Sequence, residues 1–493
     1  MSFSPIKTNR QSIFSIVVFA AYLLLLAFSI CHHEPWGDEL HSWNIAKGSE
    51  SLGQLFANSR YEGHPPVWYV LMWCLSRLTH NLVYLQCLQY LLITSAVYLA
   101  VFKSRLPDLA KWLLPFGYFF LYEYGTLSRN YAVGILLAFA ICVWLGQKRQ
   151  GSLGYYLLLF GLSNTHLLGL LLAASLHLYF LLGCDKKLRL THLFGALVLL
   201  PAAWFIFPPG DSQMNTSFWL RIWSDRMFDN ILAAPLKAFV PVPAWWEPHF
   251  WNTHFMQDQS MWLIGTCSLL LTALAGWILR KDKRSLTVFL VNVVLTCLVA
   301  LVFPITSVRY TGFLFIGFLV ASWLHSSSKP LTGSSKALLC GLLLLQLGGS
   351  IIALPRDYRE PFSNAYRVNE LLRQVPATDS VACDYWCLNN VAAYSDQAVY
   401  CIELQKNVSF LLWDKALAAV TGQAHGYVAG LNHLVQTAHL SRVWMVSCHG
   451  PDVLARKDPP LTTHFAVQLK SHAEGAIEPG SNIYLYLLTP VAP

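Results

Sequence analysis

The feature that most constrains the fold of this chain is a series of apolar segments between residues 13 and 354, separated by short polar loops. Of the 493 residues, 55% are hydrophobic and only 12% are charged, against about 25% charged residues in a typical soluble domain. No A-x-A cleavage site follows the first segment, residues 13–30, so we expect a retained membrane anchor. The sequence therefore predicts a polytopic α-helical membrane protein.

The distribution of Lys and Arg predicts how the segments are oriented. Cytoplasmic loops carry an excess of these residues, and the basic loops here are KSRLPDLAK, QKRQ, CDKKLR, RKDKR and SSSKPLTGSSK. They all fall on one side if about eleven segments cross the membrane and the segment that begins at His64 (HPPVWYVLMWCLSRL) is an interfacial or re-entrant helix. The expected spans are residues 13–30, 82–102, 112–122, 131–145, 154–162, 167–182, 193–207, 262–279, 286–303, 313–324 and 337–354.

Two domains follow from this topology. Residues 1–355 form the transmembrane module, with a first outer loop at 31–64 and a Trp-rich outer loop at 208–258. Aromatic residues prefer the membrane interface, so we expect the second loop to lie along the bilayer surface as short amphipathic pieces. It is either a simple interfacial belt or the wall of a groove for a lipid chain or a sugar.

The remainder, residues 356–493, is polar, and we expect it outside the cytoplasm. The stretch SNAYRVNELLRQ has helical spacing, whereas DSVACDY, QAVYCIE, HLSRVWMVSC and SNIYLYLL have the pattern of strands. This alternation predicts a small α/β domain, and it contains no glycine fingerprint of a nucleotide site. Four cysteines are available there for disulfides whose pairing the sequence leaves open: Cys383, Cys387, Cys401 and Cys448.

Ionisable residues gather at the outer ends of the expected spans. Such residues are costly near the membrane and by default indicate function. Together they predict a site for an anionic headgroup, because arginine forms planar, bidentate contacts with phosphate. The residues are Asp38, Glu39, Arg60, His64, Glu123, Arg129, His166, Arg309 and Tyr310.

Several of these residues lie in motifs that resemble a known family. The Asp38–Glu39 pair after the first span, the stretch SRYEGHPPVWYVL, the Ser-Arg pair at 128–129 and the Arg-Tyr pair at 309–310 resemble the GT-C glycosyltransferases. The most similar groups are the protein O-mannosyltransferases and the lipid A aminoarabinose transferases. The resemblance covers residues 1 to about 355, and the C-terminal domain matches only as an appended extracytoplasmic module.

The resemblance implies a sugar donor linked to polyprenyl phosphate, an acceptor outside the cytoplasm, and Asp38 in the place of the catalytic aspartate, with Glu39 in the same motif. Many members carry an acidic residue a few positions after the Ser-Arg pair, whereas SRNYAVG has none and Glu123 is the only local carboxylate. A divalent metal site is therefore not supported, and we expect no cofactor.

The chemistry of the residue types fits sugar transfer from a phosphate. A carboxylate must take the proton of the acceptor, which suits Asp38, and cations must stabilise the leaving phosphate, which suits Arg60, Arg129 and Arg309. His64 and His166 either bind phosphate or sugar or are structural. With no second carboxylate placed as nucleophile, we expect inversion at the anomeric carbon. Two adjacent carboxylates repel, so we also expect one of Asp38 and Glu39 to have a raised pKa.

Two other functions fit the chain less well. A transporter or flippase for a lipid-linked or anionic solute usually has charges at the bilayer midplane and internal repeats, whereas these charges lie at span ends. A non-catalytic scaffold would leave the polar cluster without a purpose. The leading prediction is a membrane glycosyltransferase of the bacterial inner (plasma) membrane, in contact with membrane lipids and not with nucleic acid. The sugar, the polyprenol and the acceptor (protein, lipid or glycan) stay open.

Overall fold

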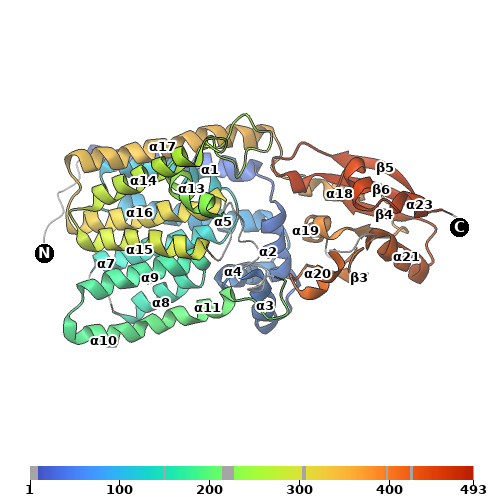
Figure 1. Ribbon diagram of the computed structural model, residues 1–493, viewed down its shortest axis with the longest axis horizontal. Coiled ribbons are helices and arrows are strands. Elements are labelled where there is room, and N and C mark those ends of the chain that lie inside the picture. The colour runs from blue at the N-terminus through green and yellow to red at the C-terminus, as the bar shows by residue number, and fades with distance from the viewer. Residues whose placement is uncertain are drawn as a thin grey trace.

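A computed structural model describes residues 9–147, 151–213, 227–301, 307–395, 398–421 and 426–491. The chain forms a helical bundle and a smaller domain built on a sheet, which lie at opposite ends of the long axis of the molecule (Figure 1). Three short helices, α2 (Gly37–Gly48), α3 (Leu52–Ser59) and α4 (Val67–Ser76), lie between the two parts.

The bundle has six helices that are long and apolar enough to cross a membrane. Their outward faces carry exposed aliphatic side chains such as Leu24 and Ile351, which suits contact with lipid. The fold is therefore that of a helical membrane protein. The six helices are α1 (Asn9–His32), α5 (Val83–Tyr98, continued by the π turn η2, Leu99–Lys103), α14 (Met261–Leu279), α15 (Lys283–Ala300), α16 (Val308–Ser328) and α17 (Gly333–Arg359).

Four of the other expected spans are shorter apolar helices. Three of them are α7 (Tyr131–Gly146), α8 (Leu153–Ser163) and α9 (Leu167–Gly183). The fourth is His192–Ile206, which begins at the end of α10 (Lys186–Phe194) and continues through η5 (Gly195–Leu199) and α11 (Leu200–Ile206). The helix expected from His64, α4, has ten residues. At about 1.5 Å per residue it is about 15 Å long, half of a hydrocarbon core of roughly 30 Å.

The expected span at residues 112–122 is not one helix. The chain there is divided into α6 (Asp108–Leu113), a 3₁₀ turn η3 (Leu114–Phe116) and a π turn η4 (Phe119–Glu123). Pro115 and Gly117 explain the breaks, because proline removes a helical hydrogen bond and glycine weakens helix interiors. The irregular backbone is buried within the protein, where such breaks are tolerated.

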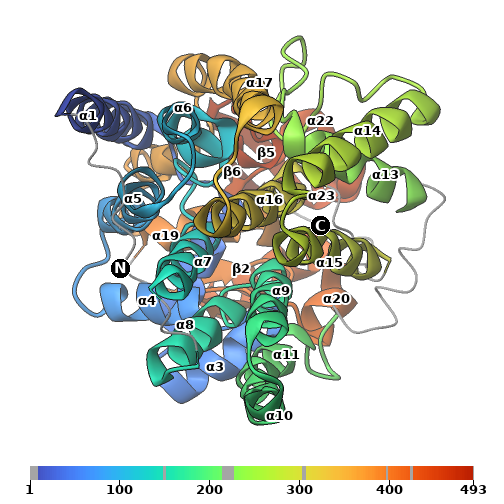
Figure 2. The same cartoon turned by 90° about the vertical axis from the view of Figure 1, so that its left-hand side faces the viewer.

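Helix α16 is the centre of the bundle. Nearly all of its residues are buried, and Figure 2 shows α7, α9 and α15 around it. Helix α13 (Met227–Phe239) from the Trp-rich loop packs against α14 and α16, with Phe239 against Phe315 and Phe318. One face of α13 is apolar, so this part of the loop is an amphipathic helix packed on the bundle. Its position along the bilayer surface stays a prediction. The stretch FWLRIW lies outside the described residues.

The C-terminal domain is a six-stranded mixed sheet with the strand order β3-β2-β1-β4-β6-β5. Strand β1 pairs in parallel with β2 and β4, and the other pairings are antiparallel. The four stretches with strand pattern contain β1, β2, β4 and most of β6, whereas the sequence does not predict β3 and β5. The strands are β1 (Val381–Cys383), β2 (Val399–Cys401), β3 (Lys406–Val408), β4 (Val443–Ser447), β5 (Phe465–Ala473) and β6 (Ile483–Pro490).

Helices cover both faces of this sheet. On one face, α18 (Val368–Leu372) and α19 (Tyr385–Tyr394) bury Leu371 and Leu388 against Val446. On the other face, α21 (Gly426–Ala438) buries Leu431 against Met445. The remaining helices are α20 (Lys415–Thr421), α22 (Pro451–Lys457) and α23 (Leu461–His464). The four cysteines considered for disulfides are buried free thiols.

The C-terminal domain contacts the bundle side of the molecule through α19, which packs on α2. The Lys47 ammonium donates to the backbone carbonyls of Ala392 at 2.8 Å and Ser395 at 2.7 Å. A second contact joins the segment that follows α11 to the segment that precedes α20: Gln213 N donates to Trp413 O at 2.9 Å. These contacts bring residues of the C-terminal domain to the N-terminal end of α2, where the polar cluster lies.

Candidate functional site

A cavity of about 300 Å³ lies where α2, the start of α4, and the N-terminal ends of α7, α9 and α16 meet the C-terminal domain. Its wall contains six of the nine residues expected from the sequence: Asp38, His64, Arg129, His166, Arg309 and Tyr310. It also contains residues that were not anticipated, among them His41, Glu62, Tyr131, Asn389 and Trp413. Glu39, Arg60 and Glu123 are not part of the wall.

Asp38 reaches the cavity because it lies in the first turn of α2. A carboxylate is favoured there by the positive end of the helix dipole. Its Oδ2 accepts from Arg309 Nη1 at 2.6 Å and lies 3.6 Å from Arg129 Nη1. The side chain keeps 37% of its surface exposed, whereas those of the two arginines keep 9% and 15%. Asp38 is thus a carboxylate held between two guanidinium groups.

The two arginines determine the protonation of Asp38. Burial favours the neutral acid, but Arg309 and Arg129 outweigh it and lower the pKa of Asp38 to about 2. Asp38 is therefore not the member of the adjacent pair with a raised pKa, because Arg309 and Arg129 lie beside its carboxylate. Without ligand, Asp38 is ionised at every physiological pH and balances the arginines.

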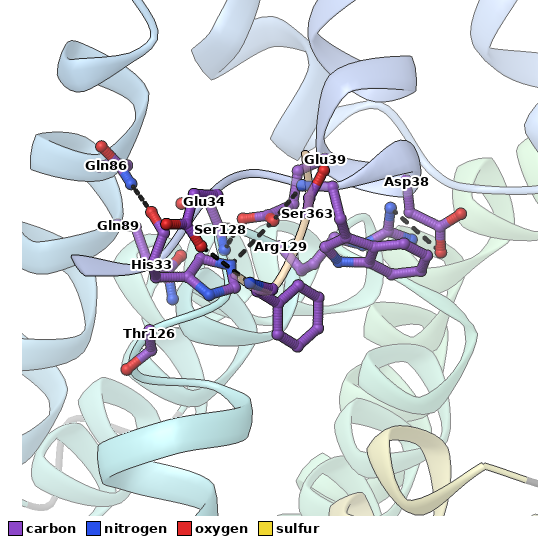
Figure 3. Close-up of polar contacts among 12 residues, drawn as sticks. His33, Glu34, Asp38, Glu39, Gln86, Gln89, Thr126, Ser128, Arg129 and Ser363 are labelled. Atoms are coloured by element: carbon purple, nitrogen blue, oxygen red, sulfur yellow. Dashed lines mark hydrogen bonds and ion pairs between the residues drawn. The ribbon is translucent and has the colours of Figure 1, made fainter. Parts of the chain in front are cut away.

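Glu39 points away from the cavity, because neighbouring residues on a helix do not share a face. Its Oε2 accepts from Trp36 N at 3.1 Å, as in a capping box, and from His33 Nε2 at 3.2 Å. Its Oε1 accepts from Ser128 N. Figure 3 shows the separation, with Asp38 beside Arg129 and Glu39 on the other side with His33 and Ser128. Glu39 is a positioning residue that ties the start of α2 to the Ser128–Arg129 loop.

His33 completes this buried network. Its Nδ1 lies 3.0 Å from Asp357 Oδ2 on α17, and its Nε2 contacts Glu39. Burial favours the neutral ring, but the carboxylates of Asp357 and Glu39 outweigh it and raise the pKa of His33 to about 10. A protonated His33 therefore donates to both carboxylates and connects the first outer loop to the last helix of the bundle.

Replacing Glu39 with Gln is expected to lower stability more than activity. Glutamine has a single acceptor oxygen where three donors converge, so at least one buried N–H loses its partner, at a cost of about 1–3 kcal/mol. Thermal unfolding of the purified protein in detergent measures this loss. Glu50→Gln, the same change at an exposed position just after α2, is the matched control and should leave the midpoint unchanged. A stable Glu39→Gln protein without activity would contradict the structural role.

Arg309 lies in the first turn of α16 within an aromatic setting. Its guanidinium carbon is 5.5 Å from the centroid of Trp36, 5.8 Å from Trp251 and 5.0 Å from Tyr310. Arg129 lies two residues before α7, and its Nη1 is 3.6 Å from Asp38 Oδ2. The Nε atoms of both arginines are buried and have no hydrogen-bond partner among the described residues. Both guanidinium groups thus keep hydrogen-bonding capacity beyond Asp38.

Two of the three histidines in the wall, His64 and His166, favour the neutral ring. Burial, and then the Arg129 charge, lower the pKa of His64 to about 4, and burial lowers the pKa of His166 well below its usual value. His166 Nδ1 accepts from Gly169 N at 3.0 Å at the start of α9, so its proton is on Nε2. Neither His166 Nε2 nor His64 Nδ1 has a partner among the described residues. His166 is therefore an N-terminal cap of α9 that retains a free donor.

On the side of the wall away from the arginines, side chains from α2, the 3₁₀ turn η1 (Arg60–Glu62) and α19 contact one another. His41, one helical turn after Asp38, contacts Glu62 Oε1 through Nε2 at 2.8 Å and Asn389 Oδ1 through Nδ1 at 3.1 Å. Burial favours the neutral ring, but the Glu62 carboxylate outweighs it and raises the pKa of His41. A doubly protonated His41 fits two acceptor oxygens. The ring of Trp413 lies 5.5 Å from that of His41.

Sequence signals existed for part of this group. His41 is three residues after Asp38, the spacing of one helical face, and Glu62 is within the SRYEGHPP motif. No signal in the sequence connects Asn389 and Trp413 to the first outer loop, because they belong to another domain.

Arg60 and Glu123 are engaged elsewhere. The guanidinium of Arg60 stacks over Trp204 at 4.1 Å. Glu123 is buried and accepts from Tyr118 at 2.9 Å and from Trp251 Nε1 at 3.1 Å, and burial raises its pKa. Glu123 therefore supports the Trp251 ring beside Arg309. Among the described residues, no group of three or more His, Cys, Asp or Glu side chains is placed to hold a metal ion.

The cations of the wall lie beside its carboxylates. Arg129 and Arg309 flank Asp38, and His41, whose pKa is raised by Glu62, contacts Glu62. The cationic side, with the neutral histidines and Tyr310, fits a singly charged phosphate ester. The other side offers a carboxylate, an amide and a Trp ring, which are groups that contact hydroxyl-rich molecules.

Comparisons with known proteins do not identify this chain: no family model, no curated protein and no solved structure matches it. The functional interpretation therefore depends on the geometry of the cavity.

Proposed function

We propose that the protein is a membrane glycosyltransferase that moves a sugar from a polyprenyl-phosphate donor to an extracytoplasmic acceptor. The observation that carries this proposal is a carboxylate, Asp38, held between two largely buried arginine side chains in the wall of a cavity at the ends of apolar helices. A site that only bound an anion would need the two arginines but not the Asp38 carboxylate. A carboxylate at the same point supplies a proton acceptor beside the bound phosphate, which transfer to a hydroxyl requires.

The proposed reaction is a single displacement. The donor phosphate binds Arg129 and Arg309, which stabilise its charge and release Asp38 from its ion pairs. The acceptor oxygen attacks the anomeric carbon and forms the new C–O bond. The bond between that carbon and the phosphate oxygen breaks, and its electron pair leaves with the polyprenyl phosphate. Asp38 takes the hydroxyl proton, and the configuration of the anomeric carbon is inverted.

The test is a transfer assay with the full chain in lipid nanodiscs. Cell-envelope glycans and glycoproteins are first compared by mass analysis with and without the protein, which identifies the acceptor. Release of polyprenyl phosphate is then followed with and without that acceptor. Acceptor-dependent release supports the proposal. Movement of intact donor across proteoliposomes, without release, would instead support the transporter alternative.

The proposal also requires the cavity and the C-terminal domain to be outside the cytoplasm. In a variant without native cysteines, Trp246→Cys and Asp452→Cys should react with a membrane-impermeant thiol reagent added to whole cells with a permeable outer envelope. Lys281→Cys and Lys336→Cys should react only after the inner membrane is opened, because basic loops are retained inside. Labelling of position 281 from outside would reverse the orientation. Lys148, whose loop has the same expected side, lies outside the described residues.

A further inference from the structure

A second cavity lies at the other end of the bundle. It also measures about 300 Å³, within the size range of roughly 300–1,000 Å³ for ligand pockets. The ends of α7, α9, α15 and α16 surround it, and Figure 2 looks onto this end of the bundle. Its wall combines polar residues, Arg105, Arg284, Ser327 and Ser328, with apolar ones such as Leu145, Phe180 and Leu324.

This cavity is separate from the candidate active site. Helix α16 connects the two, with Arg309 in the first and Ser328 in the second. At about 1.5 Å per residue these positions are about 30 Å apart, close to the thickness of a hydrocarbon core. The second cavity therefore lies at the opposite end of the bundle, where we expect the other membrane interface.

Arg284 is held in a fixed position in the wall. Its Nη2 donates to Tyr179 O at 3.0 Å, and its guanidinium carbon lies 4.2 Å from the centroid of the Tyr179 ring. A Cβ on residue 183 would lie 2.1 Å from this Nη2, so the side chain fits because that residue is glycine. The Nε of Arg284 is buried and has no partner among the described residues. The Arg284 side chain is thus held in place by Tyr179, but its Nε–H lacks a hydrogen-bond acceptor among the described residues.

The two arginines of this cavity lack an ion-pair partner among the described residues, and one carboxylate, Asp282, lies nearby. In the described part of the chain, neither Arg284 nor Arg105 forms an ion pair with a carboxylate. The carboxylate of Asp282 accepts from Ser285 and Ser328 hydroxyls at 2.7 and 2.8 Å and from the Arg284 backbone N–H. The Asp282 carboxylate thus caps the N-terminal end of α15 and forms no ion pair with Arg105 or Arg284. Both guanidinium groups are therefore available to bind an anion.

We propose that this cavity binds the phosphate headgroup of an anionic phospholipid. Arg105 and Arg284 contact the phosphate, and Leu145, Phe180 and Leu324 contact the first carbons of the acyl chains. A free phosphate would use the arginines but not the apolar wall, so the mixed lining favours the lipid. Basic pockets between membrane helices at this depth are a recurrent type of headgroup site.

A bound phosphate would also link two segments of the bundle. Arg105 lies between η2 and α6, and Arg284 lies in the first turn of α15. One anion between them joins the first half of the chain to the second at the interface. The lipid is therefore expected to stabilise the bundle as well as bind to it.

The test measures lipid binding to the delipidated full chain in detergent, by native mass spectrometry and by thermal unfolding. The probes are phosphatidylglycerol, zwitterionic phosphatidylcholine and inorganic phosphate. Phosphatidylglycerol should bind at least about tenfold more tightly than phosphatidylcholine and should raise the unfolding midpoint. Arg284→Gln and Arg105→Gln should each remove most of this preference, and Arg284→Lys should restore it in part because the bidentate fork is lost.

Arg280→Gln is the matched control. Arg280 is exposed at the C-terminal end of α14, four residues before Arg284; its guanidinium carbon lies 3.4 Å from the centroid of the Trp277 ring, outside the cavity wall. It should keep the lipid preference. If Arg284→Gln does not fold, the lipid preference of Arg105→Gln is the test, because Arg105 is exposed and its replacement should not disturb the fold. An unchanged preference in both cavity variants would overturn the proposal. Equal stabilisation by inorganic phosphate would overturn the lipid as the ligand and indicate a free anion site.

Discussion

Asp38→Asn should reduce turnover by about 10²- to 10⁴-fold, the usual contribution of a positioned general base. Asparagine has the same size and still accepts from Arg309, so the fold of the first outer loop should be kept. The substitution also removes a negative charge from between two arginines. Donor binding should therefore be unchanged or tighter, because the donor phosphate no longer competes with the Asp38 carboxylate. The measurement is release of polyprenyl phosphate in nanodiscs, together with donor affinity.

The pH dependence of the wild type offers a second measurement. A base acts only when deprotonated, and the pKa of Asp38 in the free protein is about 2. The profile of kcat/KM should thus show no loss due to Asp38 above about pH 3. In the donor complex the arginines are shared with the phosphate, so the acid limb of kcat should move to higher pH.

Asp379→Asn is the control for this substitution. Asp379 pairs with Arg442 in the C-terminal domain at 2.7 Å, outside the cavity wall, and its replacement should leave turnover unchanged. Normal turnover in Asp38→Asn would remove Asp38 as the base. Normal turnover in both Asp38→Asn and Glu39→Gln would remove the first outer loop as the catalytic centre and favour a transporter.

Arg309→Ala should weaken use of the donor by on the order of 2–5 kcal/mol, the cost of removing one partner from a buried charge pair. This corresponds to a loss of roughly 30- to 5,000-fold in kcat/KM for the donor, at about 1.4 kcal/mol for each factor of ten. Arg309 is the nearer of the two cations to Asp38, at 2.6 Å against 3.6 Å for Arg129. Its loss should therefore exceed that of Arg129→Ala.

Arg309→Lys separates charge from geometry. Lysine keeps the positive charge but lacks the planar fork, so it should restore only part of the donor affinity. Arg442→Ala, which removes the partner of Asp379, is the matched control and should leave donor affinity unchanged. Wild-type donor affinity in Arg309→Ala would place the phosphate elsewhere.

The sequence alone predicted much of the fold because the relevant signals are local. Apolar length identifies helices such as α1 and α14, and a short continuous apolar run identifies buried strands such as β4. Where local signals conflicted, prediction failed. The apolar run at 112–122 contains Pro115 and Gly117, and its backbone is broken. The Trp and Pro content of residues 208–258 also does not predict that α13 packs against α14 and α16, which tertiary contacts decide.

For the site, the sequence determined which residues lie at the same ends of the helices, because span parity and basic loops assign each end to a side. That reasoning brought Asp38, Arg129 and Arg309 together in advance. Only the tertiary structure decided which of two adjacent carboxylates faces the cavity. Asp38 turns to the arginines while Glu39 caps α2, since consecutive helical residues diverge. Only the tertiary structure adds Asn389 and Trp413 to the wall, because the packing of α19 on α2 joins residues that are about 350 positions apart and share no local pattern.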